Sequence, residues 1–431
     1  MIVMGGIVGA GIFANPSEVA HRVHTPFLIL SVWVLGGLLA MCGAFIWAEL
    51  AARLPGAAGG QYVYLREAYH PAVAFVYGWG LLLVTQTAGM AAVAVIFASY
   101  FRTLIGVAWN ESAIAAAVLL VLSGINCFGA RTGSNVQSGL MLLKIAAIAA
   151  LVIIAFAAGG HAPEPSIPML LKPFSFDVLK GIGAAMVPIA FAYGGWQTAT
   201  FVAAEIRDPC RDLSRGLLLG VSGVVVLYLG VNLACLRVLG PAGLEATTTP
   251  ASELMRIALG EDGARWIALA ITISALGFLS QSMLTAPRVY YAMARDGLFF
   301  ASVGKLFGKT EAPVVAIVLQ GVAAMVIACS GTYGEILDFE ITVDFIFFGM
   351  TAIALFVLQW RQIGSETAAY RVPGHPFTTM LFVLSCAGIV VSAIIASPRN
   401  TAIALCIMLA GLPVYYFWRR FRRAHVHDSN G

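Results

Sequence analysis

Two glycine-rich stretches interrupt otherwise apolar segments of the chain, and an interrupted helix leaves backbone groups that can bind a ligand. The first stretch runs from Gly5 to Phe13, and the second runs from Pro188 to Trp196. Because each glycine costs about 1 kcal/mol relative to alanine inside a helix, we expect breaks near Gly9 to Gly11 and near Phe191. Free N–H groups at a helix start suit a carboxylate, and free carbonyls at a helix end suit an ammonium group. The two breaks together therefore predict a binding site for a zwitterion.

Close packing of helices is the alternative interpretation of both stretches, because small residues let helices in a membrane approach one another. Two observations favour binding. Interrupted segments at corresponding positions in two halves of a chain point to a transporter built from inverted repeats. Bare backbone N–H and C=O groups are also too costly to leave in hydrocarbon, so a polar ligand or water must satisfy them.

Lys144 is a second candidate for chemistry, because it stands deep inside an apolar segment that starts near Ser134. About ten residues of helix place it roughly 15 Å from the start of that segment, close to the centre of a membrane. An unpaired lysine is expensive at that depth, so the side chain must bond to carbonyls or lose its proton. The alternative is that Lys144 only holds helices together.

Acidic residues and two histidines complete the set of candidates. The acidic residues crowd one apolar segment and are Glu335, Asp338, Glu340 and Asp344. We expect the first three to lie on a solvated outer face, whereas Asp344 is a candidate for a functional group inside the membrane. His21 and His24 lack a nearby third ligand, so interfacial histidines are expected rather than a metal site. No motif predicts a cofactor.

The composition restricts the function classes. Of 431 residues, 60% are hydrophobic and only 11% are charged, against roughly 25% charged in an ordinary soluble domain. This excludes a soluble enzyme, a nucleic-acid-binding protein and a disordered scaffold, and it makes membrane lipid the expected surroundings. No nucleic-acid partner is expected.

Twelve apolar segments are long enough to span a membrane as helices, given about 20 residues for one crossing. They are continuous apolar runs, which excludes a membrane barrel of alternating strands, and the predicted fold class is an all-α membrane protein. The segments lie near 1–22, 27–50, 72–101, 112–128, 135–158, 180–204, 215–238, 264–290, 313–330, 340–360, 377–396 and 400–418.

Lysine and arginine predict the orientation, because cytoplasmic loops retain an excess of both. The excess falls on the loops that share a side with both termini, so both termini are expected in the cytoplasm. The chain is thus expected to be a multi-pass protein of the inner (plasma) membrane. Residues 419–431 form a basic tail, which we interpret as an anchor against anionic lipid.

Several motifs together resemble the amino acid-polyamine-organocation (APC) superfamily of transporters. The first is Gly9-Ala10-Gly11-Ile12-Phe13, which is similar to the glycine signature of the first span in that family. The others are Ala48-Glu49-Leu50, Gly59-Gly60-Gln61-Tyr62, Glu67-Ala68-Tyr69, Asn126, Gly129, Lys144, Ala294-Arg295-Asp296-Gly297 and Arg371-Val372-Pro373-Gly374-His375-Pro376. The run Phe191–Trp196 most resembles the L-type and bacterial alanine-serine-cysteine exchanger branch.

The resemblance implies a leucine-transporter-like fold of five-plus-five inverted repeats with two further helices. The first repeat would occupy residues 1–158, the second 180–360, and the two trailing spans 377–418. It also implies a secondary transporter that moves amino acids by alternating access rather than an enzyme. An integral-membrane enzyme or a channel is the alternative from another class, and a cationic amino acid or polyamine carrier is the alternative within the fold.

The resemblance also assigns residues to the site. The substrate-binding residues would be Ile7, Ala10, Gly11, Ile12, Phe191, Ala192 and Gly194, with Phe191 and Trp196 as gates. Lys144 would replace the sodium ion of related carriers and bond to carbonyls of the first span. Transport would then be independent of sodium, as exchange, facilitated diffusion or proton symport.

Neutral amino acids are the expected substrates, because the predicted pocket shows no fixed charge apart from Lys144 and the candidate Asp344. The residues expected to set substrate size are Thr85, Gln86, Met90, Gly277 and Phe278. The loop from Arg102 to Glu111 lacks a cysteine, so no disulfide-linked heavy subunit is expected.

The start of the chain departs from the family pattern. Met1 to Val8 supplies only about 12 Å of helix, which does not reach from mid-membrane to the cytoplasm. We therefore expect either that residues are missing upstream of Met1 or that the inner half of the first span is truncated.

Overall fold

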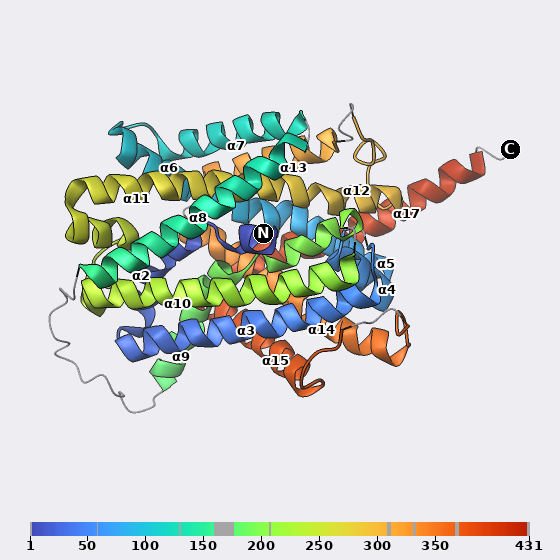
Figure 1. Cartoon of the computed structure of the whole chain (residues 1–431). Helices are drawn as coiled ribbons and strands as arrows, with labels where there is room; N and C mark the ends of the chain where they lie inside the picture. Colours follow the sequence, from blue (N-terminus) through green and yellow to red (C-terminus); the bar gives the residue numbers. More distant parts are fainter. Residues whose placement is uncertain are drawn as a thin grey trace.

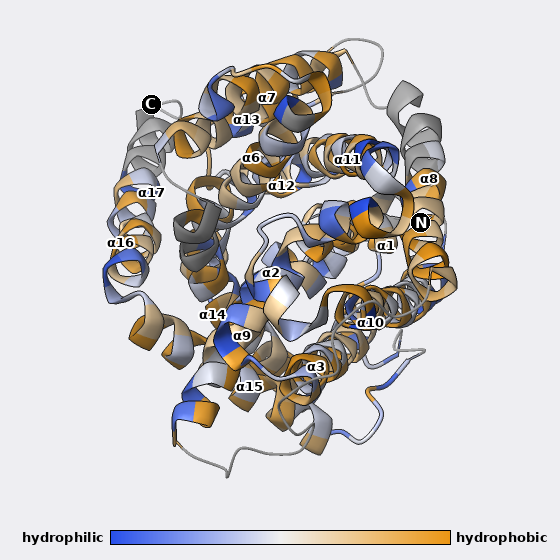
Figure 2. Ribbon diagram, turned by 90° about the vertical axis from the view of Figure 1, so that its left-hand side faces the viewer, coloured by the Kyte–Doolittle hydropathy of each residue, from blue (hydrophilic) through white to orange (hydrophobic). Residues whose placement is uncertain are grey.

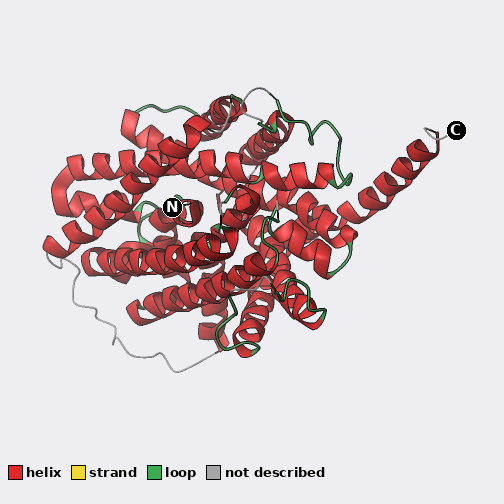
Figure 3. Cartoon of the chain, turned by 45° about the vertical axis from the view of Figure 1, so that its right-hand side comes forward, coloured by secondary structure: helices red, strands yellow, loops and turns green. Residues whose placement is uncertain are grey.

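The computed structural model is almost entirely helical (Figure 3), which confirms the predicted all-α fold class. It describes residues 2–57, 59–128, 131–158, 176–206, 208–307, 312–330, 333–366 and 370–428. In these ranges the only β-type pairing is one antiparallel bridge between Phe307 and Ala312. The motif residue Gly129 and the last three residues of the predicted tail, 429–431, lie outside the described residues.

The helices account for the predicted spans. Eight helical segments within the described ranges are long and apolar enough to cross a membrane, and three shorter apolar helices accompany them. With the broken first helix, these make the twelve predicted spans. In chain order the helices are α1 (Ile2–Ile7), α2 (Gly11–Val23), α3 (Pro26–Arg53), α4 (Gln61–Ala68), α5 (Pro71–Gly80), the π-helical turn η1 (Leu81–Thr85), α6 (Gln86–Ile105), α7 (Glu111–Cys127), α8 (Arg131–Ala157), α9 (Phe176–Tyr193), the 3-10 helix η2 (Trp196–Glu205), the π-helical turn η3 (Pro209–Leu213), α10 (Ser214–Glu245), α11 (Pro250–Thr285), α12 (Pro287–Arg295), α13 (Val314–Ser330), α14 (Tyr333–Trp360), α15 (Phe377–Ala396), α16 (Pro398–Leu409) and α17 (Gly411–Asp428).

The long helices lie side by side as a bundle, and α17 projects from one end of it (Figure 1). Seen along the bundle, much of the ribbon of the surrounding helices has the colour of hydrophobic residues (Figure 2). Large exposed side chains of the outer surface include Leu120, Val226, Trp266 and Val326. Such a surface suits hydrocarbon rather than water.

The first helix is broken at the bundle centre. Helix α1 ends at Ile7 and α2 begins at Gly11, so the break covers Val8–Ala10 and overlaps the predicted position. Helix α1 contacts η2, α8, α10 and α11, and α2 contacts α3, α9, α10 and α11. Both halves therefore pack on α10 and α11, while α1 also packs on η2 and α2 also packs on α9.

The sixth span is broken as well. Helix α9 ends at Tyr193, two residues after the expected end near Phe191, and η2 begins at Trp196. Between them Gly195 has a φ of +98°, a left-handed backbone conformation that glycine adopts without the cost of a Cβ. Both interruptions of the predicted pair are therefore present.

Four predicted boundaries lie seven or more residues from the observed helix ends. Helix α10 ends at Glu245 rather than near 238, past a kink at Gly240 with a φ of +67°, and α17 ends at Asp428 rather than near 418. Helix α11 starts at Pro250 rather than near 264, because a kink at Gly260, with a φ of +75°, joins a short outer helix to the spanning part. Helix α14 starts at Tyr333 rather than near 340. This earlier start includes Glu335 and Asp338 in the helix as well as Glu340 and Asp344.

Candidate substrate site

A cavity of about 50 Å³ lies between the two broken helices, enough space for a few water molecules. Residues of both breaks line it, together with residues of η1, α6, α11 and α14. The predicted binding residues that line it are Ile7, Ala10, Gly11, Phe191, Ala192 and Gly194. Of the residues expected to set substrate size, Thr85, Gln86 and Phe278 line the cavity.

Four other predicted residues are not among those lining the cavity. Ile12 is fully buried in the apolar core. Trp196 packs edge to face on Trp47, with 4.8 Å between ring centroids. The sulfur of Met90 lies 2.9 Å from Nε2 of Gln320. Gly277 lies on α11.

The backbones of the two broken helices touch where they cross. A Cβ built on Gly195 would lie 2.1 Å from the carbonyl oxygen of Gly6, and a Cβ on Gly6 would lie 2.6 Å from that of Gly195. No side chain fits at either position. Close packing, the alternative interpretation of the glycines, therefore applies at this crossing, beside a cavity formed by the same breaks.

The start of α2 has the features of a carboxylate site. Ala10 is the residue before the helix, and no side chain caps the first amides there. These amides are at the positive end of the α2 dipole. Gly11 faces the ring of Phe191, which a Cβ on Gly11 would approach to 3.2 Å. Gly11 does not have a positive φ, so close approach, rather than special backbone angles, explains the glycine.

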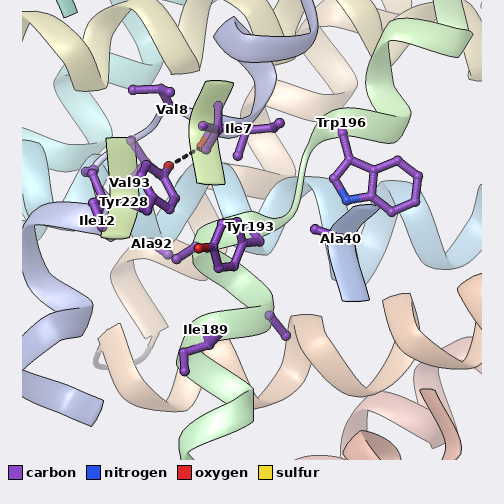
Figure 4. Close-up of a cluster of buried hydrophobic side chains, with 14 of the residues drawn as sticks. Ile7, Val8, Ile12, Ala40, Ala92, Val93, Ile189, Tyr193, Trp196 and Tyr228 are labelled. Atoms are coloured by element: carbon purple, nitrogen blue, oxygen red, sulfur yellow. Dashed lines mark hydrogen bonds between the residues drawn. The ribbon is translucent and has the colours of Figure 1, made fainter. Parts of the chain in front are cut away.

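The carbonyl of Ile7 already has two donors. The Tyr228 hydroxyl donates to it at 3.1 Å, as Figure 4 shows, and the amide of Gly9 donates at 2.8 Å. A carbonyl oxygen has two lone pairs, so an ammonium group would have to displace one donor. Tyr228 comes from α10, and nothing in its sequence surroundings indicates that contact.

Two side chains of α2 bond to the backbone of α9. Pro188 has no N–H, which frees the carbonyl of Ala184 one turn earlier, and Arg22 donates to that carbonyl at 2.5 Å. Asn15 donates to the carbonyl of Pro188 at 2.7 Å. Sequence reasoning missed both contacts, because they join residues more than 150 positions apart.

Lys144 lies behind the first break rather than in the cavity. Its side chain is 2% exposed, and Nζ donates to the carbonyl of Val8 at 2.9 Å. Ser274 of α11 donates to the carbonyl of Gly9 at 3.4 Å. Side chains from the predicted fifth and eighth spans thus satisfy two carbonyls of the break.

Glu340 was expected on a solvated face, and that expectation is wrong. Its side chain lines the cavity together with Asp344, and Oε2 is buried without a hydrogen-bond partner. The two residues lie four apart on α14 and hence on one face of that helix. The cavity therefore carries one more carboxylate than the sequence indicated. The side chains of Glu335 and Asp338 are outside what the structure describes.

A polar network, here named the Glu49 cluster, ties one end of the bundle together. The Glu49 carboxylate accepts hydrogen bonds from Arg53 Nε at 2.9 Å, from Gln359 Nε2 at 2.9 Å and from the amide of Val372 at 2.8 Å. Close by, Arg66 and Tyr62 donate to Asp296. Burial and the Asp296 carboxylate raise the pKa of Tyr62, and burial raises that of Tyr69 to about 12. The motif residues between spans two and three thus hold loops and helix ends together.

Comparisons with known proteins agree with this architecture over nearly the whole chain. The family model described as amino acid permease matches residues 1–417. The Serine/threonine exchanger SteT of Bacillus subtilis is 29% identical over 425 residues, which cover 96% of this chain and 94% of that protein. The human Large neutral amino acids transporter small subunit 2 is 25% identical, over 97% of this chain and 79% of that protein. The mouse b(0,+)-type amino acid transporter 1 is 26% identical, over 96% and 85%.

Proposed function

Because the chain belongs to the amino acid permease family, we propose that it moves neutral L-amino acids across the membrane by alternating access. The family and the relatives are transporters rather than enzymes. The observation that carries the proposal is the cavity between two broken helices, because its open helix ends match the two charges of an amino acid backbone.

In this proposal the substrate carboxylate binds the first amides of α2, at Ala10, Gly11 and Ile12. The ammonium group binds carbonyls at the end of α9, from Phe191, Ala192 and Gly194, and that of Ile7 once Tyr228 moves away. Phe191, whose ring lies against Gly11, acts as the gate nearest the substrate. Trp196 acts as a gate through its packing on Trp47.

The names of the relatives support a neutral substrate, since two of them are a serine/threonine exchanger and a transporter subunit for large neutral amino acids. A cationic amino acid is the second candidate. Glu340 and Asp344 favour it, because both carboxylates line the cavity and neither forms an ion pair with a described residue.

Counterflow in proteoliposomes tests the substrate class. Vesicles loaded with unlabelled alanine or leucine should take up the same labelled amino acid, and the twenty amino acids should be tested as competitors. Neutral amino acids are expected to compete best. A clear preference for arginine or glutamate would refute the neutral pocket.

We also propose that transport does not need sodium, with Lys144 as the fixed cation behind the first break. Its bond to the Val8 carbonyl supports this, because an ammonium group there occupies a carbonyl that an ion would otherwise use. Uptake with sodium replaced by choline should be unchanged. A drop of tenfold or more would contradict the assignment.

Three further parts of the proposal concern assembly. Residues 1–158 and 180–360 form the two inverted repeats, both termini face the cytoplasm of a plasma membrane, and no disulfide-linked heavy subunit is needed. The matching breaks in α1–α2 and α9–η2 support the repeats. Transport by the purified chain alone would support the absence of a need for a heavy subunit. A tag after residue 431 that a protease reaches only from the cytoplasmic side would support the orientation.

A further inference from the structure

We infer that Glu340 and Asp344 form a proton-binding site that couples proton movement to amino acid transport. Both side chains line the cavity and come from successive turns of α14. The inference rests on the proposed transport function and adds a driving ion to it. The site lies on α14, away from Lys144, which bonds to the first helix from α8.

The helix opposite leaves space for the Glu340 carboxylate. A Cβ built on Gly89 of α6 would lie 2.8 Å from Oε1 of Glu340 and 3.2 Å from Oε2. Any larger residue at position 89 would therefore push the carboxylate away. This close fit shows that the carboxylate has a defined position between α6 and α14.

A carboxylate oxygen at this place lacks a partner. Oε2 of Glu340 is buried and accepts no hydrogen bond. Thr85, which is 3% exposed and lines the same cavity, interacts with Asp344. A buried carboxylate oxygen without a partner costs free energy, and a bound proton removes the charge that makes this cost large.

Among the described residues, no cation forms an ion pair with Glu340 or Asp344. Tyr77 of α5 interacts electrostatically with Asp344 and with Tyr290 of α12. Arg399 of α16 lines a separate groove with Ile336 at the start of α14. Arg288 of α12 donates to the carbonyl of Leu284. The Glu49 cluster joins α3 to Gln359 near the end of α14, the Arg66–Asp296 pair joins α4 to the residue after α12, and Lys180 of α9 lies over the ring of Phe176. Helices α13 and α15 contain no charged residue, and Arg102, in the last turn of α6, pairs with Glu111.

Two adjacent carboxylates in a low-dielectric site cannot both stay ionised without a cation or a proton. Three cations come into consideration, namely a substrate side chain, a metal ion and a proton. The buried Oε2 of Glu340 is closed to a bulky ammonium or guanidinium group. No cluster of three or more metal-ligating side chains occurs among the described residues. A proton needs neither space nor further ligands.

The transport cycle then balances in charge. The pair keeps one proton throughout and takes a second from the outer solution, and the carrier crosses with that second proton and one neutral amino acid. Both leave on the inner side, and the empty carrier returns with the pair sharing the remaining proton. Each cycle moves one positive charge inward, so a membrane potential that is negative inside accelerates net uptake.

The test uses the purified chain in proteoliposomes with labelled alanine. At equilibrium, an inward gradient of one pH unit should support about tenfold accumulation. E340Q should abolish accumulation and leave exchange at a rate that no longer depends on pH. T85V, which removes the hydroxyl that interacts with Asp344, is the second variant if E340Q is not inserted, and it should shift the pH at which exchange is half-maximal. E111Q is the control for loss of a carboxylate, because Glu111 pairs with Arg102 at a helix end; it should behave as the parent chain.

Each outcome decides between the two proposals. Absence of counterflow in the parent chain would overturn the transport function itself. Counterflow without acid-driven accumulation would leave that function standing and overturn the proton site. Acid-driven accumulation retained in E340Q would also overturn it, and so would an unchanged pH dependence of exchange in T85V. Parent uptake of arginine or lysine that E340Q abolishes would assign the pair to a substrate side chain instead.

Discussion

The Glu49 cluster and the Glu340–Asp344 pair both contain carboxylates in the interior of the bundle, but the two sites differ in the hydrogen-bond partners of those carboxylates. Glu49 is 0% exposed and bonds to a guanidinium group, a side-chain amide and a backbone amide. Glu340 is held between two helices, yet its Oε2 has no partner. The cluster is complete without a ligand, whereas the pair is not.

This difference separates a structural carboxylate from a binding carboxylate. Removing one member of a satisfied buried ion pair leaves the other charge unpaired, which costs about 3–5 kcal/mol. Neutralising a buried carboxylate that has no cation beside it instead removes the free-energy cost of its unpaired charge. Substitutions in the Glu49 cluster should therefore change the stability of the protein, and substitutions in the cavity should change its transport rate.

The largest effect on transport is expected from Gly11→Val, which places a side chain against Phe191 at the start of α2. A Cβ there would lie 3.2 Å from the ring, and the larger side chain would occupy the proposed carboxylate site. Uptake should fall below detection while the protein remains folded and inserted, as size-exclusion chromatography would verify. Gly124→Val is the control, because nothing lies within 4 Å of a Cβ at that position. Near-normal uptake by Gly11→Val would mean that the site lies elsewhere.

The largest effect on stability is expected from Glu49→Gln. Arg53 would keep its charge in a buried position without a carboxylate, so the free energy of unfolding should fall by about 3–5 kcal/mol. Thermal unfolding in detergent would record this as a lower midpoint temperature. Glu340→Gln, measured beside it, should keep the parent midpoint or exceed it. Equal losses in the two variants would erase the distinction between the two carboxylate sites.

A smaller effect is expected from Lys144→Ala, since the Val8 carbonyl would lose a charge-assisted hydrogen bond of 2.9 Å. Such a bond contributes about 1.5 kcal/mol, which corresponds to roughly tenfold slower transport. Alanine binding, measured by protection against thermal unfolding, should persist because Lys144 does not line the cavity. Loss of binding together with transport would place Lys144 in the substrate site.

The smallest effect is expected from Asp296→Asn. Asp296 and Arg66 are bonded to each other, but their side chains are 30% and 31% exposed, and a partly solvated pair contributes only about 1 kcal/mol or less. The midpoint temperature should therefore change little in the same detergent assay. A decrease as large as that of Glu49→Gln would show that exposure does not weaken this pair.

Features that depend on local sequence could be predicted. Twelve apolar segments and the two glycine breaks follow from hydropathy and helix propensity, so the fold class was accessible without a structure. The contact of Lys144 with the first break followed from its depth together with the resemblance.

Contacts between distant residues could not be predicted in this way. Tyr228 reaches the Ile7 carbonyl across 221 positions, and no pattern near Tyr228 indicates it. Glu340 was misplaced because charge crowding suggested a solvated face, while the start of α14 was set seven residues late. The side chains of Ile12 and Trp196 pack in the apolar core, so the roles proposed for them depend on the amide of Ile12 and on the contact of Trp196 with Trp47.

The bonds from Asn15 and Arg22 to the backbone of α9 have a mechanical consequence. They fasten the outer half of one broken helix to the segment before the other break, at two points one turn apart along α9. At the crossing of the remaining halves, the backbones of Gly6 and Gly195 touch and the Thr198 hydroxyl lies against Gly6. Any movement that separates α2 from α9 must therefore break both long-range hydrogen bonds, that of Asn15 and that of Arg22.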